Sequence, residues 1–259
     1  MSSQTISLFR FMMLGIMSRR FLVLVAILLL AAVLSGSFIG ELAIINGDAI
    51  VSAFVADFLR YSMGLLALLM IVASVAEDYE FRQFERLLTM PLARWQYIAA
   101  QTLVIASLCL ILTMPAALLV GLYSDFTIGL YWAAALWMEL FLLGMLGLLA
   151  ILSLEKIPQA VFFSLAIYLL AKLSGLITLM LVESVKLSEG SATSRAIEFI
   201  FGLILYVIPG TRAFAESDVF FSSHDLIATL GEQMVSVTIY GLFLLAVCLV
   251  DFYRKEFNL

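Results

Sequence analysis

Two charged residues, Glu139 and Lys172, stand deep inside long apolar stretches of the sequence. If both stretches cross a membrane, the two residues lie at similar depth. A charge inside a bilayer is costly unless it is paired or hydrated. We therefore expect a polar pairing between them, as an interior ion pair or as part of a substrate path. The alternative is that Glu139 is protonated or faces a cavity while Lys172 extends toward the interface.

A second group of charged residues lies between two apolar stretches, where residues 77–94 hold seven charges in eighteen positions. Three apolar residues recur there at the spacing of one helical face: Phe81, Phe84 and Leu88. The remaining face carries Arg82, Glu85 and Arg86. Because Pro91 disfavours helix at the residue before it, we predict a helix over 79–90. Such a helix fits either a docking element for a soluble ATPase or an interfacial loop without a partner.

The run Glu85-Arg86-Leu87-Leu88-Thr89-Met90-Pro91-Leu92-Ala93-Arg94, followed by Tyr97, is distinctive. It resembles the signature of ABC transporter permeases of the type-two exporter family. In that family an acidic and basic stretch leads into Leu-Leu-x-x-Pro, then Leu, Val or Ile, then Ser or Ala, then an arginine, and after these a tyrosine and often Gly-Lys. The chain departs from the pattern at Ala100-Gln101, where Gly-Lys is usual.

The resemblance implies an all-α permease that performs no covalent chemistry and is not itself an enzyme. It implies a separate ABC ATPase (nucleotide-binding) subunit that binds ATP and magnesium, and a second permease copy, as a homodimer. The permease itself would hold no cofactor. The residues expected to couple to the ATPase are Phe81, Arg82, Phe84, Glu85, Arg86, Leu88, Pro91 and Arg94. The layout of the family includes an N-terminal interfacial helix, six spans and re-entrant helices before the last span.

Composition independently indicates a polytopic integral membrane protein. The 259 residues are 64% hydrophobic and 13% charged, with a mean hydropathy of +1.14, whereas soluble domains carry about 25% charged residues. The charges fall mostly in short connectors, which leaves no room for a soluble domain. Membrane lipid is therefore an expected partner, and nothing suggests a nucleic-acid partner.

A helix needs about 20 apolar residues to cross a bilayer. The candidate spans are 21–40, 58–76, 97–121, 131–152, 159–182 and 232–250. Residues 3–18 place apolar side chains at helical spacing and predict an amphipathic helix in the interface. Gly144 and Gly147 in the fourth span indicate ordinary helix packing.

The distribution of lysine and arginine predicts that both ends of the chain are cytoplasmic. With that orientation, nine basic residues lie inside, namely Arg10, Arg19, Arg20, Arg82, Arg86, Arg94, Lys156, Arg254 and Lys255. Four lie outside, namely Arg60, Lys186, Arg195 and Arg212. We expect a bacterial cytoplasmic (inner) membrane.

One long connector precedes the last span, and its segment 197–209 is apolar but too short to cross a membrane. We predict a re-entrant segment that gates the path, with Glu198 and Tyr206 near headgroup level. Pro209 and Gly210 would turn the chain back outward. The alternative is an interfacial helix that lies flat.

The sequence lacks the motifs that nucleotide binding, metalloprotease activity and metal binding usually require. The sequence has no phosphate-binding Gly-x-x-x-x-Gly-Lys motif and no metalloprotease motif. The single His224 makes no metal site by itself, and Cys109 and Cys248 fall in apolar runs. Two other functions stay open: a structural or assembly subunit of a membrane complex, and an ion-coupled secondary transporter that uses Glu139 and Lys172.

Overall fold

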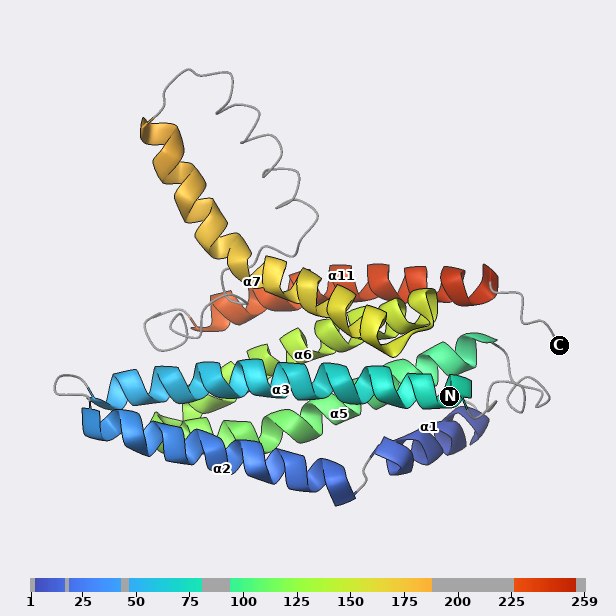
Figure 1. Cartoon of the computed structure of the whole chain (residues 1–259), viewed down its shortest axis with the longest axis horizontal. Helices are drawn as coiled ribbons and strands as arrows, with labels where there is room; N and C mark the ends of the chain where they lie inside the picture. The colour runs from blue at the N-terminus through green and yellow to red at the C-terminus, as the bar shows by residue number, and fades with distance from the viewer. Residues whose placement is uncertain (1–2, 17–18, 43–46, 81–93, 188–225, 255–259) are drawn as a thin grey trace.

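The described residues of the computed structural model, 3–16, 19–42, 47–80, 94–187 and 226–254, are almost entirely helical (Figure 1). They form seven helices: α1 (Ser3–Ile16), α2 (Arg19–Leu42), α3 (Gly47–Glu80), α5 (Arg94–Tyr123), α6 (Phe126–Leu154), α7 (Ile157–Leu187) and α11 (Leu226–Arg254). The predicted all-α class is therefore confirmed for this part of the chain.

Five of the described helices are long and apolar enough to cross a membrane. The apolar stretches are Phe21–Leu42, Ile50–Glu77, Trp95–Tyr123, Phe126–Leu154 and Leu230–Arg254. They cover five of the six predicted spans and indicate an integral membrane protein. The remaining span, 159–182, falls within α7, which has 31 residues. The apolar stretch described there is only Ile157–Leu173, so the sixth crossing stays a prediction.

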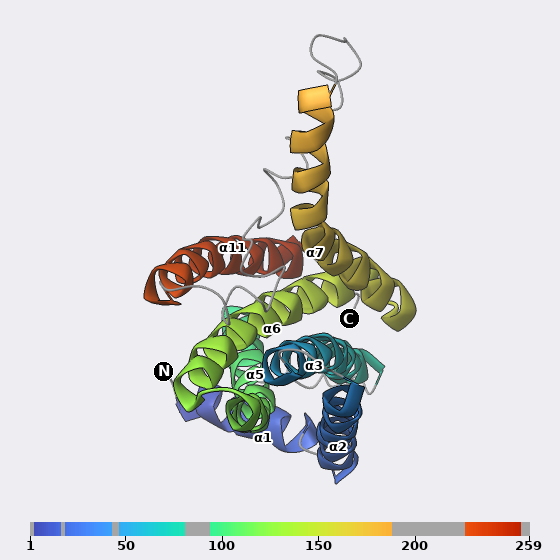
Figure 2. The ribbon, with the colours of Figure 1, turned by 90° about the vertical axis from the view of Figure 1, so that its left-hand side faces the viewer.

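Helix α6 is the centre of the bundle. It packs against α3, α5, α7 and α11, while α2 packs on the outer side of α3 (Figure 2). Small residues allow this close contact. A Cβ atom on Gly144 would lie 2.6 Å from Ile105 Cγ2 and 2.7 Å from Ile71 Cδ1, so glycine lets α6 approach α3 and α5 together. In both views the later part of α7 turns away from the bundle.

The helices alternate in direction, so one end of the bundle gathers the start of α5 and the ends of α6 and α11. Tyr97 stacks on Phe252 with ring centroids 5.5 Å apart. At the same end, the Ser153 hydroxyl donates a hydrogen bond to Asp251 Oδ2 at 3.0 Å.

Helix α1 packs against α5 and α3 at this end. Its buried side chains are Met12 and Ile16, and Leu8, Phe9 and Met13 are partly buried beside them. The opposite side exposes apolar Phe11 and Leu14. The predicted helix near the N-terminus is therefore present in the described part of the chain. Its place in a membrane interface stays a prediction.

The predicted second span, 58–76, lies inside α3, and Arg60 near its start is one of the basic residues assigned above to the outer side. The structure instead begins α3 at Gly47 and buries Arg60 to 1% exposure. The helix continues past this charge because a carboxylate on another helix lies against it, as described below.

Two predicted elements lie outside the described residues. The predicted coupling helix 79–90 overlaps α3 only at its first two positions, and residues 81–93 are not described. The segment 197–209 also falls entirely outside the described part, as do Glu198, Tyr206, Pro209 and Gly210.

Candidate functional site: a buried charge cluster between three helices

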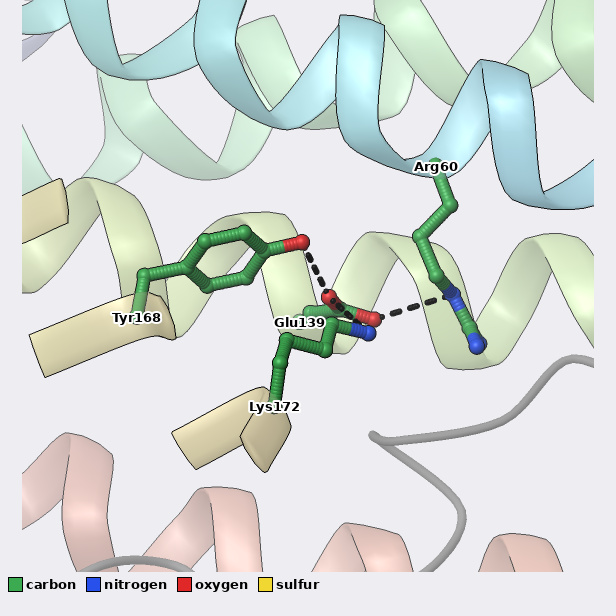
Figure 3. A network of polar contacts seen from close by, with 4 residues as sticks. All are labelled: Arg60, Glu139, Tyr168 and Lys172. Carbon is green, nitrogen blue, oxygen red and sulfur yellow. Dashed lines mark hydrogen bonds and ion pairs between the residues drawn. The ribbon is translucent and has the colours of Figure 1, made fainter. Parts of the chain in front are cut away.

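Glu139 lies at the middle of α6, where α3 and α7 both pack against it (Figure 3). Its side chain is 5% exposed. A carboxylate with so little access to water must be compensated by cations or hydrogen-bond donors. Three side chains from the neighbouring helices supply this compensation: Arg60 on α3, and Tyr168 and Lys172 on α7.

The contacts divide between the two carboxylate oxygens. Lys172 Nζ lies 2.8 Å from Oε1, and the Tyr168 hydroxyl donates a hydrogen bond to the same oxygen at 2.7 Å. Arg60 Nε lies 3.1 Å from Oε2, as an ion pair rather than as an aligned hydrogen bond. The structure thus contains the Glu139–Lys172 ion pair that their matched depth predicts.

The aromatic rings of Tyr61 and Tyr168 surround the lysine. The Lys172 ammonium lies 5.5 Å from the Tyr61 ring centroid and 5.6 Å from that of Tyr168. These distances fall in the range of cation–π attraction. The lysine therefore does not need to extend toward the interface, and that sequence-based alternative is wrong for Lys172.

Local sequence explains how Tyr168 and Lys172 act together. They are four residues apart on α7, so both side chains leave the same helical face. Gly64, one turn after Arg60 on α3, lies beside the tyrosine: a Cβ atom there would be in ordinary van der Waals contact with the Tyr168 hydroxyl oxygen, at 3.5 Å.

The guanidinium of Arg60 is only partly satisfied. Its side chain is 1% exposed, yet Nη1 and Nη2 have no hydrogen-bond partner in the described part of the chain. The cluster therefore combines a firm ion pair with two buried, unused donors. Such an arrangement can hold three helices together and can also accept an anionic group.

Other buried polar side chains lie apart from this cluster. Gln101 on α5 is 1% exposed and Gln233 on α11 is fully buried, and neither amide has a partner among the described residues. Gln101 stands at the position where the resembled family often has lysine. No group of three possible metal ligands occurs among the described residues.

The predicted site residues fall into three groups. Glu139 and Lys172 meet at the cluster. Arg94 is the first residue of α5. The other expected coupling residues, from Phe81 to Pro91, and the four expected gate residues lie outside the described part of the chain.

Sequence reasoning missed Arg60 and Tyr168. Arg60 lies only three residues after Asp57 within a long apolar region, and this isolated pair of opposite charges was a usable signal. Tyr168 gives no such signal alone, although its spacing of four from Lys172 could have drawn attention to it.

Comparison with known proteins adds no identification. No protein-family model matches the chain, and no curated protein matches it.

Proposed function

We propose that this chain is the transmembrane permease subunit of an ATP-driven ABC exporter. The residues 85–94 that resemble the family signature support the proposal most directly. Along the chain, this segment follows α3, which ends at Glu80, and leads into α5, which begins at Arg94. Both helix ends lie at the same end of the bundle (Figure 1).

The charges of that end support a cytoplasmic location. Basic residues at helix ends or connectors there are Arg20, Arg94, Lys156 and Arg254. The other end carries the exposed acids Glu41, Asp48 and Asp125. Since basic residues concentrate on the cytoplasmic side of membrane proteins, the segment 81–93 would face the compartment that contains ATP.

In this proposal the chain forms a homodimer and binds two copies of a separate ATPase subunit, which hold ATP and magnesium. Closure of the ATPases pushes on helix 79–90 and shifts the spans between two conformations. The permease supplies the path, in a bacterial inner membrane with both termini cytoplasmic. Residues 197–209 form the gate near the exit.

The test is association with the nucleotide-binding subunit in native membranes. Chemical cross-linking followed by purification of the tagged chain should recover such a subunit. The double substitution Glu85→Ala/Arg86→Ala should lower both recovery and ATP-dependent export. The control Lys156→Ala/Arg254→Ala removes two exposed charges from the same end and should change neither.

Two results would count against the proposal. One is purification from native membranes without any nucleotide-binding subunit. The other is unchanged recovery and export in the Glu85→Ala/Arg86→Ala variant.

The buried carboxylate favours one alternative, an ion-coupled secondary transporter. Carboxylates inside membrane proteins often belong to proton or ion pathways, and Glu139 bridges three helices. Transport into proteoliposomes that contain the chain alone, driven by a proton gradient, would support this function over the exporter.

A further inference from the structure

The unusual feature of the charge cluster is that the two terminal nitrogens of the Arg60 guanidinium, Nη1 and Nη2, do not contact Glu139. Only Nε faces Glu139, at 3.1 Å from Oε2. Nη1 and Nη2 are buried and unpartnered within the described residues. An arginine that served only to neutralise Glu139 would need a single contact, and a lysine would provide it with fewer buried donors.

The direct contacts are also unequal in charge. Two cations, Arg60 and Lys172, touch one carboxylate. Asp57, one turn before Arg60, is the nearest further acid on α3. It is only half-buried, and its charge also attracts Lys172. At the direct contacts, however, two cations face a single carboxylate.

We propose that Nη1 and Nη2 of Arg60 form a binding site for an oxyanion, a carboxylate or phosphate group, inside the helix bundle. The two nitrogens form a planar fork that donates two parallel hydrogen bonds to a pair of anionic oxygens. Glu139 holds the fork in place through Nε, and Lys172 adds a second positive charge across the carboxylate. The oxyanion satisfies the donors that the protein leaves open.

The site requires a change of conformation for entry, because the guanidinium is almost fully buried here. A movement of one of the three surrounding helices could provide this change, because the cluster is the polar contact that joins α3, α6 and α7. Helix α7 contributes Tyr168 and Lys172, and its later part turns away from the bundle (Figure 2). A displacement of α7 would open the cluster without unfolding the α3–α5–α6 core.

A role of this site in cargo recognition rests on the proposed exporter function, in which the exported molecule would carry an anionic group. Binding of an oxyanion to the site does not depend on the exporter function. A purified chain without an ATPase should still bind an oxyanion, so failure of this inference and failure of the exporter proposal are distinguishable.

The test measures binding by the purified full chain in nanodiscs of uncharged phosphatidylcholine. The probes are dodecyl phosphate, laurate and inorganic phosphate, and dodecyltrimethylammonium is the control of opposite charge. The readout is the shift in thermal unfolding temperature as each probe is titrated. Binding of dodecyl phosphate but not of inorganic phosphate would indicate a lipid-like ligand, and binding of both would indicate a site for the free anion.

Two variants move affinity in opposite directions. Arg60→Lys keeps the charge but removes the fork, and should weaken oxyanion binding about tenfold. Glu139→Gln removes the negative charge that repels the oxyanion but keeps a side-chain oxygen that can accept from Arg60 Nε, and should strengthen binding about threefold. Arg254→Lys, an exposed arginine at the basic end, is the matched control and should bind as the wild type does.

A purely structural role would not give this pattern, because both cluster variants would then destabilise the bundle without opposite effects on affinity. The inference is overturned if no oxyanion saturates the wild-type chain. It is also overturned if Arg60→Lys binds as tightly as wild type, or if Glu139→Gln binds more weakly. Should Arg60→Lys fail to fold, the Glu139→Gln and wild-type titrations still decide.

Discussion

Helix α6 makes two contrasting contacts little more than one turn apart. At Gly144 it meets Ile71 of α3 and Ile105 of α5 through apolar atoms alone, without room for a Cβ atom. At Glu139 it meets α3 and α7 through ion pairs and a hydrogen bond, with two donors left over. The apolar contact depends on shape and admits one geometry. The polar contact is under-satisfied, and it can therefore exchange partners.

The largest expected effect lies in the polar contact. Glu139→Ala strands two buried cations, and loss of one partner from a buried pair costs about 3–5 kcal/mol. We expect a matching fall in the free energy of unfolding, measured by SDS titration in mixed micelles. Adding Lys172→Met should restore part of the loss, because it removes one stranded charge. A double variant no more stable than Glu139→Ala would contradict this account.

The next effect tests the apolar contact. Gly144→Ala places a Cβ atom against Ile105 Cγ2, and overpacking of this kind costs about 1–3 kcal/mol. Ile105 is β-branched and stiff, so it yields little. The same SDS titration should show the loss, and Ile105→Leu should recover part of it by moving the branch outward.

The matched control for Gly144→Ala is Gly241→Ala on α11. Its added Cβ atom would lie 3.5 Å from Phe141, an ordinary van der Waals distance, so little change is expected. If both variants lost the same free energy of unfolding, the tight contact at Gly144 would be no more sensitive to an added Cβ atom than the looser contact at Gly241.

These two contacts also show what sequence reasoning can reach. Apolar length and helical spacing predict the helices well, because backbone groups in lipid must be satisfied within each segment. All six predicted ranges fall inside described helices, namely α2, α3, α5, α6, α7 and α11. Depth matching likewise predicts that Glu139 and Lys172 meet, because unpaired charges are costly at the same level of a bilayer.

Sequence reasoning failed where a charge depends on a distant partner. Arg60 reads as an extramembrane residue until Glu139 is known to lie 3.1 Å away. The open Nη1 and Nη2 atoms were equally out of reach, since only the packing of three helices shows which donors lack a protein partner. The coupling and gate residues outside the described part remain predictions.

A third prediction measures how strongly α6 and α7 are linked. A double-mutant cycle with Glu139→Gln and Lys172→Met should give a coupling energy of about 0.5–2 kcal/mol. The expected value is moderate because Glu139 keeps Arg60 and Tyr168 when the lysine is removed. Additive effects in SDS unfolding would mean that the 2.8 Å contact between Lys172 and Glu139 contributes nothing to stability.

The smallest expected effects on stability concern two hydroxyl–carboxylate hydrogen bonds, one buried and one exposed. The Tyr168 hydroxyl donates to Glu139 at 2.7 Å within the bundle, and the Ser153 hydroxyl donates to Asp251 at 3.0 Å in an exposed position at the end. Both are hydroxyl–carboxylate bonds, but water can replace the second. Tyr168→Phe should cost about 1 kcal/mol in SDS unfolding, and Ser153→Ala less than half of that. Since each variant removes one oxygen and little volume, the difference between them isolates burial. Equal losses would mean that water reaches Glu139 as readily as Asp251, and the contrast between a buried cluster and an exposed contact would then be wrong.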